Sequence, residues 1–142
     1  MKRKLCSVLL ALCMVLTLLP VSAMAEDGTL QSQIDDIETT GTVTLDKSYT
    51  EDISIPAGKT ITLDLAGHTL TNVSSNTITN SGTLTITGNG TVDNVTHQKA
   101  AVMNNVGGTV TIKNGKFTRS AEASTSENNS GNNSYYVIDN YG

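Results

Sequence analysis

The sequence has few aromatic residues and few cysteines. Its 142 residues include no tryptophan, one phenylalanine and four tyrosines, and its two cysteines, Cys6 and Cys13, lie near the N-terminus. Beyond residue 25 the chain has no thiol, so disulfide bonds and cysteine-ligated metals are excluded there. Arginine is also scarce, because Arg119 is the only one beyond residue 25.

The N-terminal 25 residues have the three parts of an export signal. Residues 2–4 are positively charged, residues 5–19 are apolar, and Ala23 and Ala25 have the spacing of a cleavage site. The apolar stretch is too short for a membrane anchor. We therefore expect a signal peptide at residues 1–25 and a secreted mature chain, extracellular or associated with the cell surface, that is not inserted in a membrane.

Without this signal the chain is acidic and rich in threonine, asparagine and glycine. Six basic residues then stand against all 13 acidic residues, a net charge of −7, so no nucleic-acid partner is expected. Threonine (21), asparagine (13) and glycine (12) account for 46 of the remaining 117 residues. Threonine favours strands, whereas asparagine and glycine favour turns. This composition predicts one small all-β domain.

Three segments repeat the same alternation of apolar and polar residues. They are Thr60–Asp64, Thr83–Thr87 and Thr109–Lys113, and their first residues are 23 and 26 positions apart. Alternation with a period of two indicates strands with one buried face. Two further columns accompany them, formed by Ile78–Gly82, Val102–Asn104 and Ile138–Gly142, and by Leu70, Val92 and Phe117.

Short strands in three columns, recurring about every 24 residues, predict a solenoid with three-sided coils. One coil cannot bury its apolar residues alone, but coils stacked about 4.8 Å apart share a continuous core and pair their backbones. We therefore predict an all-β fold, a parallel β-helix of about four coils over residues 41–142. Its core should contain three buried ladders: Ile61–Leu84–Val110, Leu63–Ile86–Ile112 and Leu70–Val92–Phe117.

Residues 26–40 are predicted to form a short N-terminal cap helix. Leu30, Ile34 and Ile37 have helical spacing, and Thr29 is a suitable N-cap residue. Such a helix would cover the open end of the solenoid, where apolar side chains and unpaired backbone groups would otherwise meet water.

The C-terminal part of the sequence is less regular. Residues 119–134 have almost no apolar side chains, which predicts a mobile polar loop inserted between two strands. Residues 140–142 repeat the pattern that precedes Thr83, so another strand is expected to follow. We therefore expect the chain to be the N-terminal piece of a longer protein, truncated at residue 142.

The segment Ile53–Leu70, followed by the phrase Asn-x-Gly-Thr-Leu-Thr-Ile from Asn80, carries a family resemblance. It resembles secreted bacterial right-handed parallel β-helix proteins of the pectin-lyase-like superfamily, especially adhesin-like or uncharacterised surface proteins of gut-dwelling Gram-positive bacteria. The resemblance covers roughly residues 29–142 and implies a right-handed parallel β-helix. It implies no single function, because the same coil carries lyases, hydrolases, phage spikes and adhesins.

No residues form a catalytic, metal-binding or cofactor-binding pattern. Calcium-dependent lyase chemistry would need carboxylates stacked on adjacent coils, but one outward column contains Asp64, Thr87 and Lys113. His68 and His97 have no partner at catalytic spacing and are interpreted as surface residues at a corner and in a polar connection. We therefore expect no catalytic residue, no metal and no cofactor in this chain.

Columns of threonine and asparagine are the main surface features. Stacked Thr-x-Thr pairs would form a flat array of hydroxyl and methyl groups, spaced about 4.8 Å by about 7 Å. This candidate binding face consists of Thr60, Thr62, Asp64, Thr83, Thr85, Thr87, Thr109, Thr111 and Lys113. Asn80, Asn104 and Asn140 are interpreted as a hydrogen-bonded structural ladder at one corner. Asn72, Asn94, Asn128 and Asn132 match the glycan-acceptor pattern, as expected by chance in such a composition.

The predicted function is that of a non-catalytic N-terminal scaffold. The exported protein would be adhesin-like and would bind carbohydrate, such as a polysaccharide or cell-surface glycan, or a surface protein. The alternative is the N-terminal portion of a polysaccharide lyase or glycoside hydrolase whose active site lies beyond residue 142. Ice binding through the Thr-x-Thr face is a further alternative, because such arrays occur on ice-binding β-helices.

Overall fold

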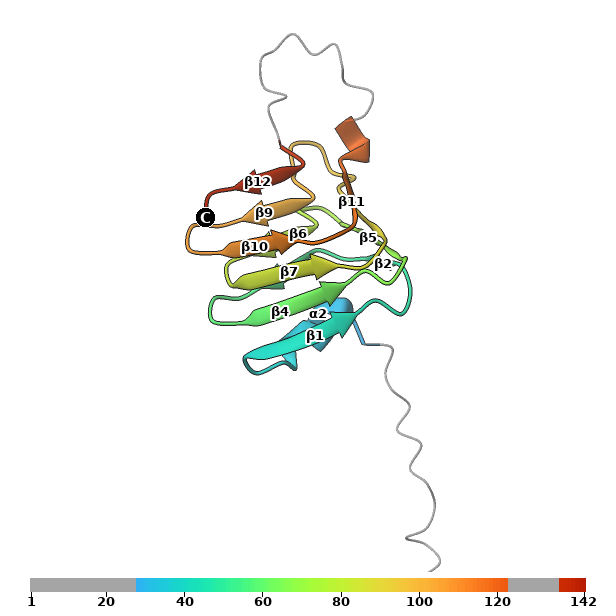
Figure 1. The fold of residues 1–142 in the computed structure, drawn as a ribbon. Helices are drawn as coiled ribbons and strands as arrows, with labels where there is room; N and C mark the ends of the chain where they lie inside the picture. The colour runs from blue at the N-terminus through green and yellow to red at the C-terminus, as the bar shows by residue number, and fades with distance from the viewer. Residues whose placement is uncertain (1–27, 123–135) are drawn as a thin grey trace, which may run out of the picture.

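The structure, a computed structural model, describes residues 28–122 and 136–142, which form a three-sided parallel β-solenoid (Figure 1). The chain visits three sheets in turn, and every strand pairs in parallel with the strand of the next turn. The first sheet contains β1 (Thr40–Thr44), β4 (Thr60–Asp64), β7 (Thr83–Thr87) and β10 (Thr109–Ile112). The second contains β2 (Tyr49–Thr50), β5 (Thr69–Thr71), β8 (Thr91–Asp93) and β11 (Lys116–Thr118), and the third contains β3 (Ile53–Ile55), β6 (Ile78–Asn80), β9 (Val102–Asn104) and β12 (Ile138–Asn140).

The all-β solenoid fold predicted from the repeats is confirmed. The chain returns to the first sheet three times between β1 and β10, so the described residues make about three turns, close to the predicted four coils. The stacked arrangement arises because each short strand buries one face and offers its backbone groups to the strands above and below. Among the described residues, no helix is long and apolar enough to cross a membrane.

The register of all three predicted core ladders is confirmed. Ile61 pairs with Leu84 and Leu84 with Val110, and the other two ladders align in the same way. The first two members of each ladder have at most 1% of their surface exposed. The core is therefore a column of aliphatic side chains that runs through the middle of the solenoid.

The prediction that every ladder residue is buried is wrong for the last turn. Val110 and Phe117 are only partly buried, and 38% of the surface of Ile112 is exposed. The reason is that β10 and β11 are the last strands of their sheets, so among the described residues no further turn covers them. Within the described part of the chain, this end of the solenoid is open.

The opposite end is covered by the helix α2 (Leu30–Asp35), which lies against β1 and β3. The Thr29 hydroxyl caps the helix by accepting a hydrogen bond from Ser32 N at 3.0 Å. Leu30 and Ile34 are fully buried in the core. A capping helix was predicted here, and it ends two residues before Ile37.

Both ends of α2 are tied to the first turns of the solenoid. The Glu51 carboxylate accepts a hydrogen bond from Leu30 N at 3.0 Å, at the N-terminus of the helix. The Lys59 ammonium donates to the carbonyl oxygens of Ile34 and Asp35, both at 2.9 Å, at its C-terminus. An anion at the N-terminus and a cation at the C-terminus match the helix dipole.

The predicted polar loop at residues 119–134 lies mostly outside the described residues. Its beginning forms a short 3₁₀ helix, η1 (Ser120–Glu122). The Asp93 carboxylate on β8 accepts hydrogen bonds from Ser120 N at 2.9 Å and from the Ser120 hydroxyl. The chain therefore stays attached to the solenoid as far as this helix.

Candidate functional site

The outer side of the first sheet is an array of threonines in two unbroken columns. In the first column, Thr40, Thr60, Thr83 and Thr109 lie in register on four neighbouring strands. In the second column, Thr42, Thr62, Thr85 and Thr111 lie in register two residues further along the same strands. Neighbouring strands of a sheet lie about 4.8 Å apart, so the hydroxyl groups repeat at that spacing. We call these eight residues the threonine face.

The sequence predicted three strands of this face and missed the first. Thr40, Thr42 and Thr44 on β1 extend it by one strand. They were missed because Gly41 stands where the other strands have an inward aliphatic residue. A Cβ at position 41 would lie 2.8 Å from the side chain of Ile37, so Ile37 fills that place in the core. The Thr-x-Thr spacing at residues 40–42 was the available signal.

The hydroxyl groups of the threonine face have no hydrogen-bond partner among residues 28–122 and 136–142. Three of the five threonines on the second sheet behave differently. The hydroxyls of Thr50 and Thr71 bond to each other at 3.1 Å, and that of Thr118 donates to Asp93 at 2.6 Å. The donors and acceptors of the threonine face are therefore available to a ligand.

The predicted charged members of the face lie in a third row, at one end of the strands. This row contains Thr44, Asp64 and Thr87 in register, and Lys113 follows β10. Asp64 Oδ1 accepts a hydrogen bond from Ala66 N at 3.0 Å and lies where a Cβ on Gly88 would be. The acid thus belongs to the turn at the edge of the face and leaves the two threonine columns uninterrupted.

The predicted asparagine column is a hydrogen-bonded ladder in the structure. Asn80 Nδ2 donates to Asn104 Oδ1 at 2.6 Å, and Asn104 Nδ2 donates to Asn140 Oδ1 at 2.7 Å. Asn80 and Asn104 have at most 2% of their surface exposed. Buried amides need such partners, so the ladder fixes the corner between the third and first sheets.

A second pair of buried asparagines lies at another corner and was missed as a structural feature. Asn72 Nδ2 donates to the Thr96 hydroxyl at 2.6 Å, and Asn72 Oδ1 accepts from Val95 N at 2.6 Å. Asn94 Nδ2 donates to Ala100 O at 2.9 Å. The sequence drew attention to both residues only through the glycan-acceptor pattern. Their side chains are at most 1% exposed, so they support the turn between the second and third sheets.

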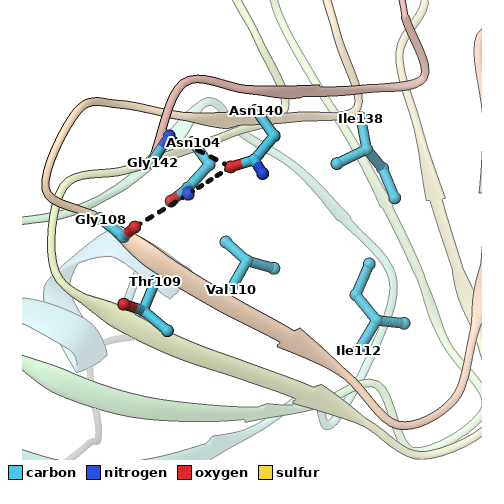
Figure 2. Close-up of a pocket in the computed structure, with 8 residues that line it drawn as sticks. All are labelled: Asn104, Gly108, Thr109, Val110, Ile112, Ile138, Asn140 and Gly142. Atoms are coloured by element: carbon cyan, nitrogen blue, oxygen red, sulfur yellow. Dashed lines mark hydrogen bonds between the residues drawn. The ribbon is translucent and has the colours of Figure 1, made fainter.

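The open end of the solenoid contains a hollow of about 520 Å³ (Figure 2). Val110, Ile112 and Ile138 form its apolar side, and Asn104 and Asn140 form its polar side. No residue of its lining carries a titratable side chain. This hollow is therefore the exposed cross-section of the core, and its polar side chains are those of Asn104, Thr109 and Asn140.

Several acidic side chains that could have been site residues accept hydrogen bonds from neighbouring backbone amides or hydroxyl groups. Asp52 accepts hydrogen bonds from Val73 N at 2.8 Å and from Ser74 N. Partial burial disfavours the charged form of Asp93, but hydrogen bonds from Ser120 and Thr118 outweigh burial and lower its pKa. The pKa of Asp46 is lowered by the hydrogen bond that it accepts from the Tyr49 hydroxyl at 2.7 Å.

The described part of the chain has no cluster of three or more histidine or acidic side chains that could hold a metal ion. His68 is half-buried on the turn before β5, and His97 is exposed on the turn before β9. These positions agree with the surface and corner residues expected from the sequence.

No protein-family model matches this sequence, and comparisons with curated proteins and with solved structures also found no match. The threonine face is therefore the candidate site on the strength of its own geometry.

Proposed function

We propose that this chain is a non-catalytic β-helix scaffold of an exported extracellular or cell-surface protein. Its threonine face binds a polysaccharide, a glycan or a protein on another surface, as in an adhesin. The observation that supports this proposal is a set of hydroxyl groups on two unbroken columns that have no hydrogen-bond partner in the part of the chain that the structure describes. The resemblance to pectin-lyase-like surface proteins and the signal-like residues 1–25 agree with it.

The chemistry of the face suits a hydroxyl-rich, repetitive ligand. Each threonine hydroxyl can donate one hydrogen bond and accept two, and its methyl group offers apolar contact beside it. A β-branched side chain has few rotamers on a strand, so little conformational entropy is lost when it binds. Single contacts of this kind are weak, but a regular array engages several repeats of one polymer at once.

The test is binding of soluble polysaccharides and arrayed glycans to the chain and to a double variant, Thr62→Val with Thr85→Val. Valine keeps the shape and strand preference of threonine but removes the hydroxyl from the centre of the face. Thr79→Val is the matched control, because Thr79 points outward from the third sheet. We expect the double variant to lose binding and the control to keep it. Equal binding by all three proteins would contradict the proposal.

Ice binding is the second candidate, and the extent of the two columns favours it. Eight threonines repeat on four strands without a charged residue between them. Two separate assays distinguish the two ligands, since inhibition of ice recrystallisation by the same double variant can be measured without any glycan. Loss of this inhibition in the double variant, with no glycan bound by the unmodified chain, would favour ice.

A further inference from the structure

Two Asn-Gly pairs are stacked at the corner between the first and second sheets. Asn89 and Gly90 lie between β7 and β8, and Asn114 and Gly115 lie between β10 and β11. Asn114 Nδ2 donates to Asn89 Oδ1 at 2.9 Å, and both asparagines are exposed. A glycine after asparagine leaves room for its nitrogen to approach the asparagine side chain.

This arrangement permits a defined covalent change. Hydroxide removes the amide proton of the glycine, and the glycine nitrogen attacks Cγ of the preceding asparagine. A new N–Cγ bond closes a five-membered succinimide ring and the Cγ–Nδ2 bond breaks. Nδ2 takes a proton from water, which regenerates hydroxide, and leaves as ammonia. Water then opens the ring at either carbonyl, which gives aspartate or isoaspartate. No electron is transferred, and the only co-reactants are hydroxide and water.

The geometry at Asn114 resembles the start of this reaction. Gly115 N donates a hydrogen bond to Asn114 Oδ1 at 2.8 Å, so the nucleophile lies beside the carboxamide that it would attack. Gly115 leads into β11, and β11 has a neighbour on one side only among the described residues. The backbone can therefore move as the ring closes.

The geometry at Asn89 differs although its local sequence is similar. Asn89 Oδ1 accepts its hydrogen bond from Asn114, and none joins it to Gly90 N among the described residues. Gly90 O accepts from Lys116 N at 2.8 Å, and Asn89 O accepts from Gly67 N. A Cβ on Gly90 would lie 2.5 Å from His68 O, so this segment is tightly packed between two turns.

We propose that Asn114 is a deamidation site of the folded chain and that it reacts severalfold faster than Asn89. The product places a carboxylate where the Asn114 amide donated to Asn89, and it removes that donor. The hydrogen bond between the two stacked turns is then lost, and isoaspartate also lengthens the backbone of a tight turn.

The experiment is incubation of the intact folded chain in mildly alkaline buffer, followed by residue-resolved mass spectrometry and isoaspartate labelling. The same chain unfolded in urea is the control, because both Asn-Gly pairs are then free to react. We expect Asn114 to react severalfold faster than Asn89 in the folded chain and the two rates to converge in urea. The variant Asn114→Gln should lose the signal at residue 114, since glutamine cannot form the five-membered ring.

Equal rates in the folded chain, or faster reaction at Asn89, would overturn the proposal. A rate ratio that stays the same in urea would also overturn it, since the difference would then come from local sequence and not from the fold. Asparagines at residues 128–133 are resolved separately by the fragment spectra, so their reaction does not enter the comparison.

Discussion

The Glu51 carboxylate binds the backbone amide of Leu30, which lies 21 residues earlier in the chain. Its second oxygen accepts a hydrogen bond from Gln31 N at 3.2 Å. The first amides of a helix have no partner within the helix, so a side chain from elsewhere must satisfy them. One acid therefore joins the cap helix to the end of β2.

Replacing Glu51 by alanine should destabilise the chain by about 0.5–2 kcal/mol, the usual cost of losing a helix cap. The urea concentration at half-unfolding measures the change. Glu38→Ala is the control, because Glu38 is exposed and follows the helix without capping it. A similar loss of stability in both variants would show that the effect comes from overall charge.

Because one end of the solenoid is open, we expect alanine substitutions in the core to lower stability by different amounts in different turns. Ile86→Ala in the middle turn should cost about 2–5 kcal/mol, because it leaves a cavity in a fully buried site. Ile112→Ala removes the same atoms from the next rung of the same ladder, where 38% of the surface is exposed, and should cost clearly less. Denaturant unfolding of the two variants gives the comparison. Equal costs would mean that the last turn is covered in solution.

The sequence predicted the registers of the solenoid because each turn repeats one pattern. Thr60–Asp64, Thr83–Thr87 and Thr109–Ile112 alternate with period two, and stacking of like on like follows directly. The first turn was harder to align, because Gly41 replaces an inward side chain to make room for Ile37. That exchange joins a residue after the cap helix and a residue of a strand, and no periodicity reveals it.

The sequence predicted that the threonines of the candidate site align in columns. It could not predict which of their hydroxyl groups are available to a ligand. Periodicity placed Thr62 beside Thr85. It could not show that their hydroxyls lack partners within residues 28–122 and 136–142, while those of Thr50 and Thr71 bond to each other. The role of Asn94 was also hidden, because its partners lie on turns whose paths depend on the whole fold.

We expect the helix η1 to detach from β8 in acid, because the Asp93 carboxylate holds it there. Its pKa is lowered below the ordinary value of 3.8, so its stabilising effect is present above that value and is lost as the pH falls through the lower folded pKa. Amide exchange at Ser120, compared with Thr85 in the middle of the first sheet, should rise selectively in this range. In Asp93→Asn the Ser120 amide should exchange fast at neutral pH as well. Protection of Ser120 that does not change with pH would refute this role.

A carboxylate at position 104 should make stability fall as the pH rises, which is opposite to the effect of Asp93. Asn104 Nδ2 donates to Gly108 O at 3.0 Å and to Asn140 Oδ1, so in Asn104→Asp one acid oxygen would face two acceptors. Repulsion and burial favour the protonated acid there, which raises its folded pKa above the unfolded value of about 3.9. The folded state then binds more protons, so stability falls as the pH rises between these two values and stays low above them. Urea unfolding across this range checks the direction.

Asn105→Asp is the matched control, because Asn105 is only half-buried and its partner, the Ser81 hydroxyl, can turn to donate to a carboxylate. A parallel pH response in the two variants would show that the ladder does not require a donor at Asn104.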